Sequence, residues 1–193
     1  MPCTIQARRW DTLVEALETA KGDAMIASMR ATPALRGRLD FSSPYYLTPA
    51  RFAARKSFPE GEIDAKILAK KTVGVIKGSA HAAFLARFFP EAKPKTYGDF
   101  AALSHALKAS EIDLVFADGV TLADWLNGED AGGCCGFRGG PYLDSRFFGE
   151  GVAIAVRKED QTLRGALDWA LARVSADGRY AEIFRKYFPI SFY

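Results

Sequence analysis

Two polar residues follow apolar segments that are typical of buried strands, and both could bind the charged groups of a small ligand. Ser79 lies between a predicted strand at residues 71–77 and a predicted helix. Its hydroxyl and the free amides of the first helical turn could bind an anion such as a carboxylate. Asp118 ends a second apolar run, where its carboxylate could bind an ammonium group. Each residue could instead cap the helix that follows it.

Three further residues could contact the same kind of ligand. Arg30 and Arg36 follow the apolar run at residues 24–29, and either guanidinium could hold a carboxylate through two hydrogen bonds. A solvated surface arginine is the alternative for each of them. Trp10 could stack on a ligand or belong to the core.

The composition excludes several classes of function. The chain has 193 residues, 49% of them hydrophobic, which is enough to bury a substantial core. Its net charge of +3 is spread among interleaved acidic and basic residues, so nucleic acid is not an expected partner. No apolar run approaches the roughly 20 residues that cross a bilayer. No motif indicates a cofactor, and Ser79 does not belong to a phosphate loop.

The cysteines do not form a metal-binding pattern. Cys3 is isolated, and neither histidine lies at ligand spacing from Cys134 and Cys135. Disulfides between adjacent cysteines are geometrically strained, so we expect Cys134 and Cys135 to be unbridged small residues in a strand.

The elements that position these residues alternate between strands and helices. Strands are predicted at residues 4–8, 24–29, 71–77, 94–97 and 113–117. Asp99 is predicted to cap one of the intervening helices. Alternation of this kind indicates an α/β fold with parallel, doubly wound sheets.

Two extended, β-prone runs, at residues 39–46 and 149–158, bracket one complete α/β unit. Two such strands could form a hinge between two lobes. We expect the connecting strands near residues 50–55 and 151–157. The predicted lobes are residues 1–55 with 149–193 (lobe 1) and residues 56–148 (lobe 2).

Longer motifs then occur in a fixed order along nearly the whole chain. They are WDTLVEAL at 10–17, GDAMIASM at 22–29, TP at 32–33, LDFSSPYY at 39–46, VGVIKGS at 73–79, IDLVFAD at 112–118, FFGEGVAIAVRK at 147–158 and DGRY at 177–180. Their types and order resemble the polar amino-acid-binding proteins of ABC transporters (family 3 type), such as those for lysine, arginine and ornithine or for histidine.

The resemblance implies the two-lobe type II periplasmic binding-protein fold, with a mostly parallel sheet in each lobe and a small amino-acid-like ligand trapped between the lobes. In lobe 1, it implies that Trp10 stacks on the ligand and that Ser28 and Arg30 lie on the rim. In lobe 2, it implies that Ser79 binds the ligand carboxylate and that Asp118 binds the ligand ammonium. The arginine that clamps the carboxylate in the family falls on Leu35 here, so either Arg30 or Arg36 replaces it or the ligand is not an ordinary α-amino acid.

The resemblance also implies partners and a compartment. A membrane permease of an ABC transporter is the expected partner, and the periplasm is the expected location, although residues 1–5 do not read as a secretory signal. The family begins with a further strand and helix, so we expect lobe 1 to be truncated and Cys3 to be half of a lost disulfide. Exposed strand edges in such a lobe predict self-association.

Two other functions fit the same motifs. Some relatives dehydrate prephenate or arogenate, and His81 and Glu150 are the plausible proton donors for such an enzyme. Neither lies in a recognisable catalytic context, which favours binding over catalysis. The ligand-sensing domain of a signalling receptor is the other alternative.

Overall fold

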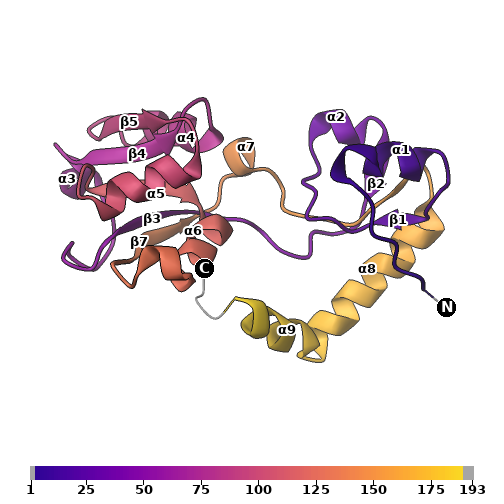
Figure 1. Ribbon diagram of the computed structural model, residues 1–193. Coiled ribbons are helices and arrows are strands. Elements are labelled where there is room, and N and C mark those ends of the chain that lie inside the picture. The colour runs from indigo at the N-terminus through magenta and orange to yellow at the C-terminus, as the bar shows by residue number, and fades with distance from the viewer. Residues whose placement is uncertain (1–2, 189–193) are drawn as a thin grey trace. The chain divides into compact units, whose positions relative to one another are not determined.

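The computed structural model describes residues 3–188, which form two compact units (Figure 1). Unit 1 comprises the described residues up to Leu47 together with Glu150–Tyr180. Unit 2 comprises Thr48–Gly149 together with the described residues from Ala181 onwards. The α/β class predicted from the sequence is confirmed.

Unit 1 is built on a small antiparallel sheet in which β8 (Ala155–Arg157) lies between β1 (Ala24–Met25) and β2 (Leu39–Phe41). Its apolar side chains pack against α1, and the buried core comprises Leu17, Met25, Met29, Ala31, Leu39, Phe41, Ala153 and Ala155. Its helical segments are η1 (Trp10–Thr12), α1 (Leu13–Glu18), α2 (Pro33–Arg36) and α8 (Gln161–Ala176). The mostly parallel sheet predicted for this lobe is not observed among the described residues, because β1 and β2 both pair with the oppositely directed β8.

Unit 2 contains a five-stranded sheet in the order β5-β4-β6-β3-β7. The strands are β3 (Ala50–Arg55), β4 (Thr72–Ile76), β5 (Lys93–Tyr97), β6 (Leu114–Asp118) and β7 (Cys135–Tyr142). The pairs β5–β4 and β4–β6 are parallel, whereas β3 runs antiparallel to both of its neighbours. Residues 50–55 were predicted to belong to lobe 1, but β3 pairs on both edges within the sheet of unit 2.

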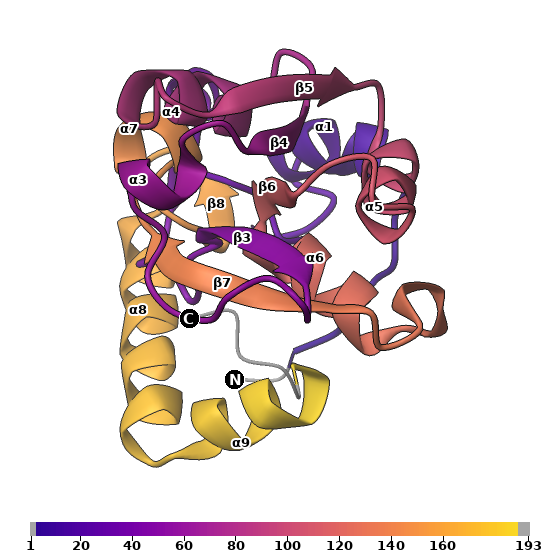
Figure 2. The same cartoon turned by 90° about the vertical axis from the view of Figure 1, so that its left-hand side faces the viewer.

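Helices cover both faces of this sheet (Figure 2). On one face lie α3 (Ala65–Leu68), α4 (Ala80–Phe88) and α7 (Ser145–Phe148), which pack on Phe52 and Phe116. On the other face lie α5 (Phe100–Lys108) and α6 (Gly119–Asn127), followed by η2 (Glu129–Ala131). Close packing explains Gly74 in β4, because a Cβ there would lie 2.5 Å from side-chain atoms of Leu103 and Ile112.

The secondary structure of unit 2 follows the sequence closely. The strands predicted at 71–77 and 94–97 correspond to β4 and β5, and Asp99 caps α5 by accepting a hydrogen bond from the amide of Ala102 at 2.8 Å. In unit 1 the prediction is poorer. No strand forms at residues 4–8, and the run 24–29 is a strand only at Ala24–Met25. Ser28 adopts a left-handed conformation with φ of 51°, which ends the extended run.

The prediction for the adjacent cysteines is wrong. Cys134 and Cys135 form a disulfide at the start of β7, while Cys3 is free and exposed. The expectation rested on the strained geometry of such a bridge. In the structure Gly132 and Gly133, both with left-handed backbones, lead the chain into the bridged pair.

The C-terminal helices carry exposed apolar side chains. No residue of α8, or of α9 (Arg179–Tyr187), is buried. Trp169 in α8 is 68% exposed, and Ile183 and Tyr187 in α9 are also exposed. Among the described residues, no helix is both long and apolar enough to cross a membrane.

Candidate functional site

The carboxyl ends of β4 and β6 bring two of the predicted site residues to one edge of the sheet of unit 2. The two strands are parallel neighbours, with Val73 opposite Leu114 and Gly74 opposite Val115. Ser79 follows β4, and Asp118 is the last residue of β6. In open α/β sheets this edge is where ligands bind.

Ser79 is the N-cap of α4. Its Oγ accepts a hydrogen bond from the amide of Ala82 at 3.1 Å, and Gly78 before it has a left-handed backbone with φ of 71°. The half-buried hydroxyl keeps a proton that it can donate. Because the amides of a helix N-terminus carry partial positive charge, this position suits an anion.

Asp118 is the N-cap of α6. Its Oδ1 accepts hydrogen bonds from the amide of Thr121 at 3.0 Å and from the hydroxyl of Thr121 at 3.2 Å. The chain beyond it is fixed to β3, since the amide of Gly119 donates to the carbonyl of Pro49 at 2.7 Å. The carboxylate is therefore held in one orientation. The capping role, which was the alternative for both Ser79 and Asp118, is present, and their ligand-binding roles stay predictions.

Aromatic side chains lie beside this edge. His81, in the first turn of α4, stacks on Phe148 with ring centroids 5.2 Å apart and meets Phe116 edge-on at 5.8 Å. The imidazole therefore packs against aromatic rings. The other proton donor considered above, Glu150, forms an ion pair with Arg36 in unit 1.

In unit 1, Ser28 and Arg30 lie near the segment that precedes β8. Arg30 forms an isolated β-bridge with Val152, and Tyr46 bridges the same residue. Tyr45 is half-buried and its side chain hydrogen-bonds with Ser28. Burial raises the pKa of the Tyr45 hydroxyl, an effect that the hydrogen bond with Ser28 partly offsets, so Tyr45 remains a neutral hydrogen-bonding group at neutral pH.

Tyr45 was not among the residues predicted for the site. From the sequence, Tyr45 and Tyr46 could each stack on a ligand or belong to the core, and the hydrogen bond with Ser28 could not be predicted because it joins positions 17 residues apart.

Arg36 and Trp10 differ in their contacts and exposure. The guanidinium of Arg36, at the end of α2, contacts the carboxylate of Glu150 at 2.5 Å and lies over the ring of Phe41. Arg36 thus already holds a carboxylate of the chain itself. Trp10 is the first residue of η1 and is 61% exposed, which excludes the alternative that it belongs to the core.

No group of three or more His, Cys, Asp or Glu side chains within residues 3–188 could hold a metal ion. The charged groups at the sheet edge of unit 2 instead suit a small zwitterion, with a donor and a helix N-terminus for its anion and a carboxylate for its cation.

Comparison with known proteins identifies the family. The model of the bacterial extracellular solute-binding proteins, family 3, matches residues 1–190. This chain belongs to that family. The family consists of solute-binding transport proteins, so the chain is a binding protein and not an enzyme.

The relatives of this family 3 protein include an "L-arginine-binding protein" of Pseudomonas aeruginosa, which is 34% identical over 99% of this chain and 74% of the relative. The "ABC transporter arginine-binding protein 1" of Escherichia coli is 32% identical over 97% of this chain and 74% of the relative.

Among solved structures, a substrate-binding domain of a putative amino acid ABC transporter from Streptococcus pneumoniae has a TM-score of 0.77 at 26% identity. That match covers 93% of this chain and 78% of the solved chain. It supports the two-lobe solute-binding fold predicted from the sequence.

Proposed function

We propose that this protein is the amino-acid-binding component of an ABC uptake transporter and that its ligand is a basic L-amino acid, with arginine the first candidate. The observation that carries the proposal is the placement of Ser79 and Asp118 at one edge of the sheet, each at the start of a helix, in a chain matched by the family 3 model. The arginine-binding names of two relatives at 34% and 32% identity support a basic ligand.

The residue roles follow from the charges. The Ser79 hydroxyl and the N-terminal amides of α4 bind the ligand carboxylate, and Asp118 binds the α-ammonium. Trp10, Ser28 and one arginine of unit 1 supply further contacts. Arg30 and Arg36 are both candidates for the carboxylate clamp, and Arg36 would have to exchange the carboxylate of Glu150 for that of the ligand.

The transporter assignment implies a membrane permease as partner and the periplasm as location. Both rest on the family and on the names of the relatives. A division into two lobes, with residues 56–148 in the second lobe, is part of the same proposal, and the strand at residues 50–55 pairs within that second lobe.

Self-association through unit 1 is a separate part of the proposal. The two-residue strand β1 lies at the edge of its sheet, and Trp169 on α8 is exposed. Unpaired strand edges and exposed apolar side chains can pair with a second copy of the chain. Sedimentation equilibrium of the Trp169→Glu variant beside the wild type tests this proposal: a wild-type monomer contradicts it, and a dimer that the variant weakens supports it.

A thermal-shift comparison of four compounds tests the ligand. L-arginine is expected to raise the midpoint, since a ligand at 100 times its Kd adds about 2.7 kcal/mol to the free energy of unfolding. Agmatine lacks the carboxylate and N-acetylarginine lacks the free ammonium, so both should give small shifts. L-glutamate tests the preference for a basic side chain. Equal shifts with agmatine and L-arginine would contradict the role assigned to Ser79.

A further inference from the structure

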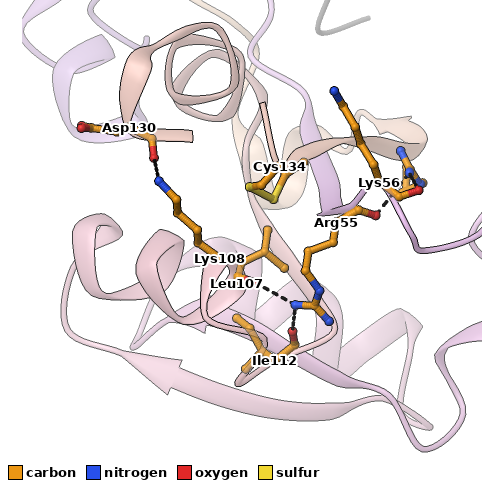
Figure 3. Close-up of a disulfide and its surroundings, with 9 residues drawn as sticks. Arg55, Lys56, Leu107, Lys108, Ile112, Asp130 and Cys134 are labelled. Carbon is orange, nitrogen blue, oxygen red and sulfur yellow. Dashed lines mark hydrogen bonds between the residues drawn. A yellow bond between two sulfur atoms is a disulfide. The ribbon is translucent and has the colours of Figure 1, made fainter. Parts of the chain in front are cut away.

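The Cys134–Cys135 disulfide lies at the opposite end of the sheet of unit 2 from Asp118. Along β3, Arg55 pairs with Cys135, whereas Ala50 pairs with Asp118. The disulfide therefore takes no part in the ligand site proposed above. Figure 3 shows it beside Arg55, Lys56 and the end of α5.

The two bridged cysteines differ in exposure, and Cys134 is the more exposed of the two. Cys135 is 7% exposed and packs in the core, whereas Cys134 is half-buried. The two residues before Cys134 are exposed glycines, Gly132 and Gly133, which carry no side chains of their own. A small thiol can reach Cys134 with Cys135 as the leaving group.

Cationic groups surround the turn that leads into the disulfide. The ammonium of Lys108 donates to the carbonyl of Asp130 at 2.6 Å and would lie 3.5 Å from a Cβ placed on Gly132. The ammonium of Lys56 would lie 3.9 Å from a Cβ on Gly133. Cations close to a thiol stabilise its thiolate, so we expect these two lysines, on the turn that leads into the disulfide, to favour thiol–disulfide exchange at the pair.

Backbone hydrogen bonds hold the chain on both sides of the bridge. The amide of Lys56 donates to the carbonyl of Cys134 at 2.9 Å, and the amide of Cys134 donates to the carbonyl of Ala131 at 3.2 Å. β7 continues from Cys135 in register with β3. A bridge between adjacent residues closes almost no loop, so it restrains the unfolded chain little. Reduction should leave β7 in place.

We propose that Cys134 and Cys135 form a reducible site that exchanges with small dithiols and, once reduced, binds trivalent arsenicals through both sulfurs. A thiolate of the dithiol attacks Cys134 Sγ, and Cys135 leaves as a thiolate. The second thiol of the reductant then closes its own disulfide and releases Cys134, so two electrons pass to the protein. With phenylarsine oxide, the two thiols form two As–S bonds and release one water.

The test uses the full chain with Cys3→Ser, which removes the exposed free thiol. The folded protein is treated with dithiothreitol, and the thiols are counted by mass spectrometry after maleimide labelling. Two labels per chain are expected, with the circular dichroism spectrum unchanged. Phenylarsine oxide should then bind one per reduced chain, and at least about tenfold more weakly to the Cys134→Ser variant, which has a single thiol at the site.

Three results would overturn the inference: no labelling of the folded protein, labelling only together with unfolding, or equal arsenical affinity of the paired and single-thiol variants. L-arginine binding measured on the same reduced sample is expected to match that of the oxidised sample. Failure of arginine binding in both forms would count against the proposed function and leave the thiol result standing.

Discussion

Replacing Asp118 by asparagine separates its two roles. The carboxylate caps α6 through Oδ1, which accepts from the amide and hydroxyl of Thr121. Asparagine keeps a carbonyl oxygen in this position and is as good an N-cap as aspartate. The substitution removes the negative charge, which is the property that the proposed ammonium contact needs.

The two effects have different sizes. Loss of a charge at a helix N-terminus costs roughly 0.3–1 kcal/mol of stability. Loss of a charged, hydrogen-bonded partner in a partly dry site costs roughly 2–5 kcal/mol of binding. The Kd for L-arginine should therefore rise by about 30-fold or more, because each 1.4 kcal/mol is a factor of ten.

Asp64→Asn is the matched control. Asp64 caps α3 by accepting from the amide of Ile67 at 2.8 Å, and it precedes β4 rather than following a strand of the sheet. Urea unfolding and isothermal titration calorimetry are measured for both variants. Asp64→Asn should change stability by a similar small amount and leave the Kd unchanged. A Kd for Asp118→Asn within about threefold of the wild type would refute the ammonium role.

Three further substitutions test the charge and packing of the fold. A hydrogen bond from Lys158 lowers the pKa of the Asp40 carboxyl group. The ionised Asp40 therefore stabilises the fold above the unfolded pKa near 4, and this stabilisation is lost as the pH falls through the lower folded pKa. The urea midpoint of the wild type should fall more steeply below pH 4 than that of Asp40→Asn. Arg51 is 8% exposed and stacks on Phe137, and its Nε and Nη1 have no hydrogen-bond acceptor among the described residues. Arg51→Met should therefore leave the free energy of unfolding unchanged or raise it by about 1–3 kcal/mol. A clear loss of stability in urea unfolding would contradict this. Phe52→Ala removes a fully buried ring and should cost about 3–5 kcal/mol in the same assay, where a cost below about 1 would show that the aromatic core is loosely packed.

Local signals predicted unit 2 well. β4 and β6 are short apolar runs, whereas the parallel strand β5 is polar and exposed. Ser79, Asp99 and Asp118 are capping residues placed between a strand and a helix. A helix cap and a buried strand both depend on residues that are neighbours in the chain, so a single sequence can reveal them.

Unit 1 depends more on distant contacts, and its details could not be predicted. Residues 24–29 have the composition of a strand, yet the left-handed Ser28 interrupts them and pairing with β8 stops after Met25. The pair formed by Arg36 and Glu150 joins residues 114 positions apart, and nothing local to either residue indicates the other.

The most direct test of the central claim is a calorimetric titration of L-arginine into the purified chain. The account predicts saturable binding of one arginine per chain, with a Kd that is weakened at least about 30-fold in Asp118→Asn. A folded protein that binds neither L-arginine nor another basic amino acid would contradict it.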